Sequence, residues 1–404
     1  MVFSMSRSLR AARLATFAFF ALNGFLMGMW IVHIPAVEHR TGISHAVLGS
    51  LLLLLGAGAF LGMQIAGPLT DRIGSRRTVP VGAALCSAAL VLPAVAGDVL
   101  TLGVALFVLG FGNGCLDVAM NTHAVQVERA YGRPVMSAFH AVFSLGGVLA
   151  ALTGALTLGL GWSTTLTLTT VAVLGLVLTV PASAALLPSP AEQAKDRAEA
   201  APGVKRRTPA RIWALAALAF ALMLCEGVAN DWSALHLRDV LDAPAATAAL
   251  AYGAYSTAMT AGRLVTDRVV ARTGPVFVVR YGAVLAALGL TAAALGDSVP
   301  MALAGWTAFG LGLSGCVPQF FSAAGHEDRG GSGTNVSRVA GLGYLGMLAG
   351  PAVIGPLTHL VPLNLALLLP VALCLVAAGA AGVLRARPPA TEGSRPRPAS
   401  EPAA

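Results

Sequence analysis

The sequence predicts an all-α integral membrane protein whose twelve transmembrane helices form two pseudo-symmetric six-helix bundles. Three observations favour this fold. Apolar residues make up 56% of the 404-residue chain and charged residues only 11%, whereas soluble domains carry about 25% charged residues. Apolar runs long enough to cross a bilayer recur from end to end. One charged loop also occurs in both halves, which indicates that a helical bundle was duplicated.

The composition excludes several classes of function. A soluble globule could not cover this much apolar surface with so few charges, so lipid must surround most of the chain. The 46 glycines fit a membrane bundle because small residues let transmembrane helices approach closely. The sequence contains no phosphate-binding Gly-Lys-Ser/Thr loop, nucleophile elbow or metal-ligand cluster. We therefore expect neither an enzyme nor a bound cofactor or metal, and we expect no nucleic-acid partner despite the net charge of +8.

Twelve apolar runs of about 20 or more residues can each cross roughly 30 Å of hydrocarbon as a helix. Residues 188–209 separate the sixth run from the seventh and are rich in charge, proline and alanine, which predicts a solvated cytoplasmic linker. The linker divides an N-terminal bundle, 1–187, from a C-terminal bundle, 210–386. Residues 387–404 are predicted to be a disordered cytoplasmic tail. The predicted spans are 13–38, 44–69, 78–97, 99–128, 134–160, 163–187, 210–237, 244–269, 275–296, 299–324, 333–358 and 361–386.

Positive charge is distributed unequally between the two sides of the predicted membrane. With the N-terminus inside, all of the 26 Lys and Arg residues except Arg40 and Arg238 fall on the cytoplasmic side. Cytoplasmic loops carry such an excess, and inverting the topology would reverse it. We therefore expect a multi-pass protein of the inner or plasma membrane with both termini in the cytoplasm.

The repeated loop joins the second apolar run to the third and the eighth to the ninth. Its first copy is Gly67-Pro-Leu-Thr-Asp71-Arg72-Ile-Gly74-Ser-Arg76-Arg77, and its second begins Gly262-Arg263-Leu-Val-Thr-Asp267-Arg268. A signal for topology alone would need the arginines but would not explain Asp71 and Gly74. A carboxylate near a helix end can pair with arginine or with the free amides of a helix N-terminus. We therefore interpret Asp71 as a pairing group.

Ionisable side chains inside a bilayer need a reason, since each costs about 2.5–3.5 kcal/mol on translocon scales. In the fourth run, Asn113, Asp117 and Asn121 are four residues apart and share one helix face. This polar stripe is expected to line a cavity, and for the two asparagines an interhelical hydrogen-bond ladder is the alternative. Asp117 is predicted to exchange a proton, because an unpaired buried carboxylate tends to titrate.

The seventh run carries a second polar cluster, Glu226-Gly-Val-Ala-Asn230-Asp231-Trp232. Glu226 and Asn230 share a helix face, and we interpret Glu226 as a carboxylate that faces the cavity. Trp232 lies near the outer end of its run. It could therefore stack on a bound solute or anchor the helix at the membrane interface as part of an aromatic belt.

Three further polar residues complete the candidate site. His140, in the fifth run, can change charge near neutral pH, so it could exchange a proton with Asp117 or simply bridge two helices as a neutral imidazole. Asn23 in the first run and Gln319 in the tenth are uncharged cavity candidates that neighbouring groups could also satisfy.

The first loop, Gly67-x-Leu69-x-Asp71-Arg72-x-Gly74-x-Arg76-Arg77, resembles the signature of the major facilitator superfamily. With twelve helices and a charged central linker, the resemblance covers nearly the whole chain. It implies a transporter whose halves rock around a central site and whose loops form a cytoplasmic charge latch that holds the outward-open state. The gate residues that it implies are Gly67, Asp71, Arg72, Gly74, Arg76, Arg77, Arg263, Asp267 and Arg268.

The fourth and fifth runs are similar to the fucose:proton symporter branch of that superfamily, and the whole chain resembles uncharacterised bacterial permeases of this branch. The similarity lies in Asp117-Val-Ala-Met-Asn121 and in the segment from Met136 to Gly146, MSAFHAVFSLG. It implies that Asp117 contributes to proton coupling and sugar recognition, and that His140 occupies the place of a sugar-binding amide. The acid that this branch carries on its first helix has no counterpart here, which departs from the pattern for fucose.

We expect a secondary transporter that moves a small polar solute, sugar-like by resemblance, by proton-coupled symport, and that works as a monomer. Proton-driven efflux of amphipathic compounds is the main alternative, and a membrane sensor that transports nothing is a minor one. The partners expected are the solute, protons and the lipid bilayer. The residues expected to couple protons are Asp117, Glu226 and His140, and those expected to bind the solute are Asn23, Asn113, Asn121, Asn230, Trp232 and Gln319.

Overall fold

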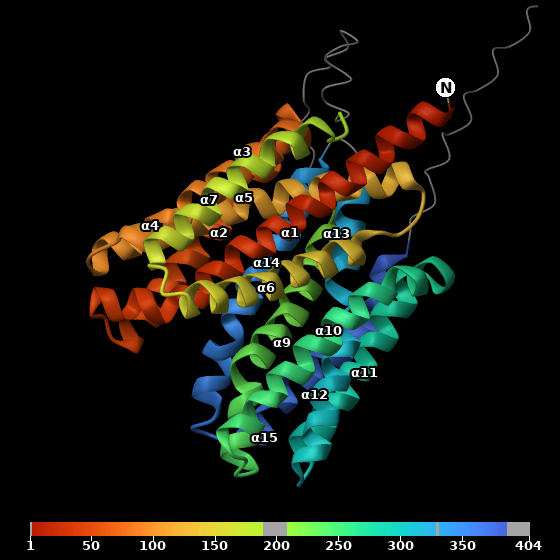
Figure 1. Ribbon diagram of the computed structural model, residues 1–404. Coiled ribbons are helices and arrows are strands. Elements are labelled where there is room, and N and C mark those ends of the chain that lie inside the picture. The colour runs from red at the N-terminus through yellow and green to blue at the C-terminus, as the bar shows by residue number, and fades with distance from the viewer. Residues whose placement is uncertain (1, 189–207, 329–330, 386–404) are drawn as a thin grey trace, which may run out of the picture.

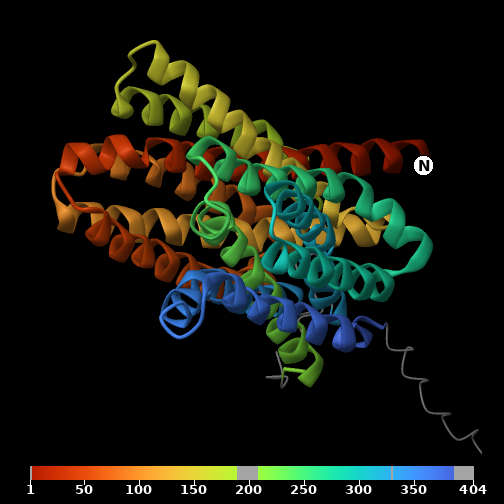
Figure 2. The same ribbon diagram turned by 90° about the horizontal axis from the view of Figure 1, so that it is seen from below.

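The two halves of the chain form two groups of helices (Figure 1). The computed structural model describes residues 2–188, 208–328 and 331–385, and all regular elements in these ranges are helices. The N-terminal group is coloured red to yellow and the C-terminal group green to blue (Figure 1). In the view from below, the C-terminal helices lie in front of the N-terminal ones (Figure 2). Residues 189–207 of the predicted linker and the predicted tail lie outside the described residues.

The N-terminal half has six membrane-length elements, and polar residues begin three of them. Ser44, Asp98 and Ser163 each accept a hydrogen bond from a backbone amide of the first turn, which satisfies donors that a helix leaves free. The hydrogen bond from the Thr101 amide holds the pKa of the exposed Asp98 carboxyl below its usual value. The helices are α1 (Val2–Thr41), α2 (His45–Ile73), α3 (Ser75–Ala89) continued by α4 (Val91–Val95), α5 (Val99–Tyr131), α6 (Met136–Gly159) and α7 (Thr164–Ala184).

The C-terminal half repeats this order. Its fourth membrane-length element is broken at Ser314 and Gly315, which separate α12 from α13, so one predicted span is two helices. The helices are α9 (Ala210–Val240), α10 (Ala245–Thr273), α11 (Pro275–Leu295), α12 (Val299–Leu313), α13 (Cys316–Glu327), α14 (Ser332–Leu357), α15 (Leu363–Ala366) and α16 (Leu368–Ala380), which a 3-10 turn, Ala381–Leu384, follows.

Of the twelve predicted spans, eleven are long and apolar enough to cross a membrane within the described ranges. The remaining span is the eighth in chain order, α10. It has 29 residues and is therefore long enough, but it carries Arg263, Asp267 and Arg268 among many small polar residues. The predicted fold is confirmed, and the exception marks a helix whose polar face needs protein partners rather than lipid.

Backbone-to-backbone packing recurs at matching places in the two halves. A Cβ atom on Gly110 of α5 would lie 1.9 Å from the carbonyl oxygen of Leu55 in α2, and a Cβ on Gly310 of α12 would lie 2.2 Å from that of Tyr255 in α10. The turns that follow α2 and α10 also match, because Gly74 and Gly274 both have positive φ, at 89° and 82°. Each half is thus held together by equivalent close helix contacts.

We predict that Gly110→Ala and Gly310→Ala lower the melting temperature of the purified protein in detergent. The added methyl groups would overlap a backbone carbonyl, and overpacking costs about 1–3 kcal/mol. Gly253→Ala in α10 is the matched control, because a Cβ there meets nothing within 4 Å and alanine favours a helix. Equal melting temperatures for all three variants would contradict the packing argument.

Candidate functional site

The two halves meet through two equivalent pairs of helices. α2 packs against α14, and α10 packs against α6. Since α2 and α10 are the second membrane helices of their halves and α6 and α14 the fifth, each contact joins a second helix to the fifth helix of the opposite half. We call the end of the bundle that holds Gly74, Gly274 and the starts of α6 and α14 the gate end.

At the gate end, Asp71 of α2 occupies the N-terminus of α14. Its carboxylate accepts hydrogen bonds from the backbone amides of Gly333 and Thr334 at 2.7 and 2.8 Å, and from the Thr334 hydroxyl at 2.6 Å. The first amides of a helix have no partner inside the helix, and a negative charge there is also favoured by the helix dipole. Asp71 therefore caps a helix of the other half.

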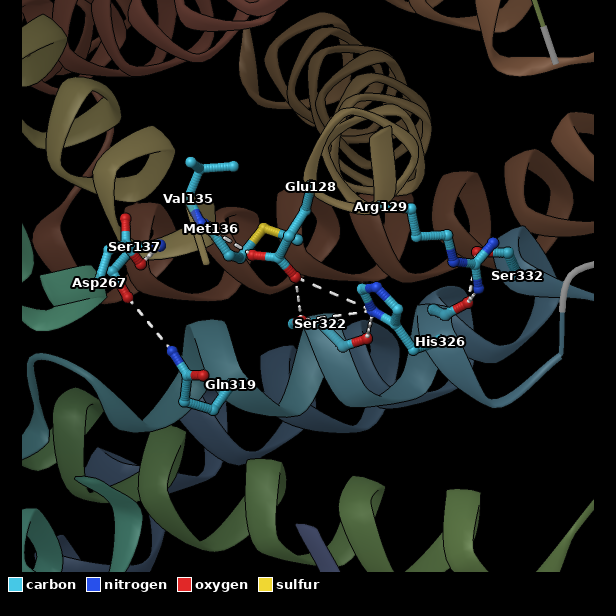
Figure 3. Close-up of polar contacts among 11 residues, drawn as sticks. Glu128, Arg129, Val135, Met136, Ser137, Asp267, Gln319, Ser322, His326 and Ser332 are labelled. Atoms are coloured by element: carbon cyan, nitrogen blue, oxygen red, sulfur yellow. Dashed lines mark hydrogen bonds and ion pairs between the residues drawn. The ribbon is translucent and has the colours of Figure 1, made fainter. Parts of the chain in front are cut away.

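Asp267 of α10 makes the same contact in the reverse direction. Its two carboxylate oxygens accept hydrogen bonds from the backbone amides of Ser137 and Ala138, at 3.0 and 2.7 Å, at the start of α6. Figure 3 shows Asp267 beside Ser137. The repeated loop has thus placed one carboxylate from each half on a helix N-terminus of the other half.

Glu128 adds a third contact between the halves (Figure 3). Within its own half, it accepts hydrogen bonds from the backbone amides of Val135 and Met136, at 3.0 and 3.1 Å. Toward the other half, its second oxygen accepts a hydrogen bond from the Ser322 hydroxyl and lies 3.9 Å from Nδ1 of His326. This carboxylate therefore holds the α5–α6 connection against α13.

The gate end also contains a cavity of about 870 Å³. Arg129, next to Glu128, donates a hydrogen bond to the carbonyl of Gly325 in α13. Gln319 lies here rather than beside Asp117, and its amide donates to the Ser137 hydroxyl at 3.3 Å. The charged and polar residues that line the cavity are Glu128, Arg129, Arg133, Arg211, Gln319, Ser322, His326 and Glu327.

The remaining loop residues are arranged unequally. Gly67 lies against α14, and a Cβ on Gly333 would be 2.5 Å from the carbonyl oxygen of Gly67. Gly74 makes the turn between α2 and α3. The positive side chains expected in the gate, Arg72, Arg76, Arg77 and Arg268, are exposed. The two carboxylates and Gly67 of this motif make contacts across the gate.

Between the halves and away from the gate end lies a buried polar cluster that starts at Asp117 of α5. Asn121 donates to the backbone carbonyl of Asp117 at 2.9 Å and contacts the carboxylate Oδ1 at 3.4 Å. Its own Oδ1 lies 3.2 Å from Nε2 of His140 in α6. The other carboxylate oxygen, Oδ2, is buried without a hydrogen-bond partner in the described part of the chain.

The cluster continues from α6 into the other half. Ser144 donates to the backbone carbonyl of His140 at 3.2 Å and accepts a hydrogen bond from Nη1 of Arg263 at 2.9 Å. Nη2 of Arg263 lies 4.0 Å from Oε1 of Glu226 in α9. A series of polar contacts, which we call the central chain, therefore runs from Asp117 through Asn121 to the imidazole of His140, and from the backbone carbonyl of His140 through Ser144 and Arg263 to within 4.0 Å of Glu226.

A model of the major facilitator superfamily matches residues 14–334. The chain belongs to the major facilitator superfamily. It is a multi-pass membrane protein, and members of this superfamily are transporters of small molecules.

Two relatives illustrate its place in the superfamily. It is 34% identical to an uncharacterised transporter of the superfamily from Yersinia pestis, over 91% of this chain and 94% of that protein. It is 31% identical to the membrane protein MosC of Rhizobium meliloti, over 89% of this chain and 86% of that protein.

Two solved structures of the superfamily have a similar fold. FucP, the fucose:proton symporter of E. coli, in its outward conformation has a TM-score of 0.78 and 18% identity over 93% of this chain and 98% of that one. The human organic anion transporter MFSD10 has a TM-score of 0.75 and 15% identity over 92% and 99%. At these identities the likeness shows the fold alone.

The other predicted solute-binding residues have different surroundings. Asn113 is buried in α5 beside Tyr344 of α14. Asn23 of α1 is fully buried, and both its side-chain polar atoms lack partners among the described residues. Asn230 is exposed, and Trp232 packs on the C-terminal core, with its ring near Gly355. The structure thus joins Asn121 to the two acids and His140 through the central chain, but does not link Asn230 or Trp232 to it.

Sequence reasoning did not single out several residues of these sites. Thr334, Ser144 and Tyr344 were not candidates, because a hydroxyl group in a small-residue segment gives little signal. Arg263 was assigned to the gate with Asp267, but it contacts Ser144 and Glu226 instead. The spacing contained this information, since a residue four positions before Asp267 lies one helical turn deeper.

We predict that Asp71→Asn and Asp267→Asn each increase the fraction of protein that is open at the gate end. Each change removes a charge and one acceptor from a helix N-terminus. Hydrogen bonds to charged groups contribute about 1.5–3 kcal/mol, so the open-to-closed ratio should rise roughly 10- to 100-fold. Distances between spin labels on Ala130→Cys and Thr273→Cys, in a variant without the native cysteines, measure this change.

The control for this experiment is Asp297→Asn, an exposed carboxylate at the opposite end of the bundle. Its label distances should equal those of the unmodified sequence. If the two gate variants also retain the closed distance distribution, the carboxylate caps do not hold the halves together.

Proposed function

We propose that this protein takes up a small polar solute together with protons by alternating access of a central site. The observation that carries the proposal is the central chain, which connects a carboxylate of one half, Asp117, to a carboxylate of the other, Glu226, through groups that can donate and accept hydrogen bonds. Its solute has the size and hydrogen-bonding character of a sugar, as the resemblance to the fucose:proton symporter branch implies.

Asp117 is the proposed carrier of the coupling proton. It is 5% exposed, Oδ2 lacks a partner, and the ion pairs found among the described residues leave it out. An isolated carboxylate charge in a membrane is expensive, and protonation removes that cost. Glu226, in contrast, has Arg263 as a counter-ion. His140, whose imidazole contacts Asn121 and whose backbone carbonyl accepts from Ser144, is proposed to exchange a proton at the Asp117 side of the central chain.

The gate carboxylates are proposed to set the state that accepts solute from outside. Asp71, Asp267 and Glu128 close the gate end with hydrogen bonds to amides and hydroxyls, which can be exchanged for water as the halves rock apart. Positive charge concentrates at this end in the sequence, so we propose that it is the cytoplasmic end, with both termini inside and the protein in the inner membrane. The resemblance favours a monomer.

The solute can be sought by thermal stabilisation of the purified protein, since a ligand that binds only the native state raises its apparent stability. Sugars, polyols and small acids should be screened at pH 6 and pH 8. Stabilisation by amphipathic cations, with no response to any of these polar solutes, would instead favour efflux.

We predict that Asp117→Asn abolishes solute uptake driven by a pH gradient in proteoliposomes but retains exchange of labelled for unlabelled solute. The amide mimics a permanently protonated carboxyl group, so the carrier can bind solute but cannot release the proton. Asp98→Asn, an exposed carboxylate at the start of the same helix, is the control and should transport as the unmodified protein does. Undiminished proton-driven uptake by Asp117→Asn would remove Asp117 from the coupling mechanism.

A further inference from the structure

Arg263 is a buried guanidinium with fewer partners than its donors require. Its side chain is 12% exposed, and within the described residues its one hydrogen bond runs from Nη1 to the Ser144 hydroxyl. The Nε–H group is buried without an acceptor. A guanidinium has five N–H donors, and leaving a buried donor unsatisfied costs about 1–3 kcal/mol. The site around Arg263 therefore lacks an acceptor.

Glu226 does not supply this acceptor in the observed arrangement. Its Oε1 lies 4.0 Å from Nη2, which is too far for a hydrogen bond, and Oε1 is itself buried without a donor. The two charges attract each other, but each group retains unused hydrogen-bonding capacity. A ligand can thus bind Arg263 by adding contacts, before any existing hydrogen bond of the guanidinium is broken.

The unused groups on Arg263 differ in kind from those on Asp117 and Asn113. On Arg263 they are donors, and the edge formed by Nε and Nη2 matches the two oxygens of a carboxylate. On Asp117 and Asn113 the buried unpaired atoms are oxygens, Oδ2 and Oδ1, of which the amide oxygen is an acceptor in every state. A solute with a carboxylate at one end and hydroxyl groups at the other complements both sets.

We propose that the transported solute is a small hydroxylated carboxylate, that Arg263 binds its carboxylate group, and that Asn113 and Asp117 bind its hydroxyl groups. This inference rests on the proposed transport function and names its class of substrate. Glu226 is then a competitor of the solute, because its carboxylate and that of the solute seek the same guanidinium.

Competition of this kind links the proton to the anion. A proton on Glu226 removes its attraction for Arg263 and leaves the guanidinium to the solute, so proton and anion each strengthen the binding of the other. The other titratable groups that interact with this pair from the surrounding helices include His140, Tyr255 and Tyr344, and the thiols of Cys225 and Cys316, with Asp117 acting through Tyr344 and the central chain. A neutral glutamine at position 226 should reproduce the effect of the proton on Glu226.

The test compares matched solutes on the purified full chain by thermal stabilisation and by titration calorimetry. The acids are gluconate, glucuronate and glycerate, and their neutral counterparts are sorbitol, glucose and glycerol. We expect an acid, but not its neutral counterpart, to bind. Arg263→Gln should abolish this binding. Arg263→Lys should weaken it more than about ten-fold, since lysine keeps the charge but lacks the paired N–H donors of the guanidinium edge. Arg272→Gln, at the exposed end of α10, is the control.

Glu226→Gln keeps the test decisive if the Arg263 variants fail to fold. It should bind the acid at least about ten-fold more tightly than the unmodified protein at pH 8, and a gain of affinity cannot result from misfolding. If no acid binds Glu226→Gln, or if neutral solutes bind as well as acids and Arg263→Gln retains them, the inference is overturned. Proton-driven uptake of a neutral solute that needs Asp117 but not Arg263 would overturn it while leaving the proposed function intact. Absence of proton-driven uptake for every solute that binds would overturn the proposed function itself.

Discussion

A helix that begins in the interface between the halves leaves amide groups that need acceptors, and this requirement organises the gate end. α6 and α14 begin there, and the acceptors come from the opposite half, as Asp267 and Asp71. Each carboxylate serves as a cap and as a link between halves in a single contact. Within each half, glycines such as Gly110 and Gly310 bring helices into backbone contact. Rocking of rigid halves requires close packing within each half and hydrogen bonds between the halves that can be broken and remade.

The sequence was sufficient for the fold because its signals are local. Apolar length defines each helix, and the repeated loop relates the halves. It also suggested that Asp71 could pair with a helix N-terminus, but not that Gly333 and Thr334 would provide it, because no local pattern says which helix begins opposite which loop. Arg263 shows the same limit. Proximity in sequence to Asp267 suggested the gate, whereas one turn of helix and the neighbouring α6 and α9 place it beside Ser144 and Glu226.

The two polar regions differ in how completely their hydrogen bonds are made. At the gate end, each carboxylate that links the halves has at least two donors. In the central chain, an oxygen of Asp117 and one of Glu226 lack a donor, and Nε–H of Arg263 lacks an acceptor, among the residues described. Unpaired groups of this kind lower the stability of the protein alone. The central chain is therefore a site where the folded protein is less stable than full hydrogen bonding would make it, as expected of a binding site.

One helix belongs to both regions. Arg263 and Asp267 are four residues apart on α10, so they share a face and are separated by about 6 Å along the axis. A helix is stiff over one turn, and no loop separates the two residues. A displacement of Arg263 would therefore also displace Asp267, which binds the N-terminus of α6. α10 is therefore a rigid connection between the central chain and the gate end. The spacing between the two residues is fixed by the helix geometry. A bound molecule that drew the guanidinium away from Ser144 would therefore also strain the hydrogen bonds between Asp267 and the N-terminus of α6.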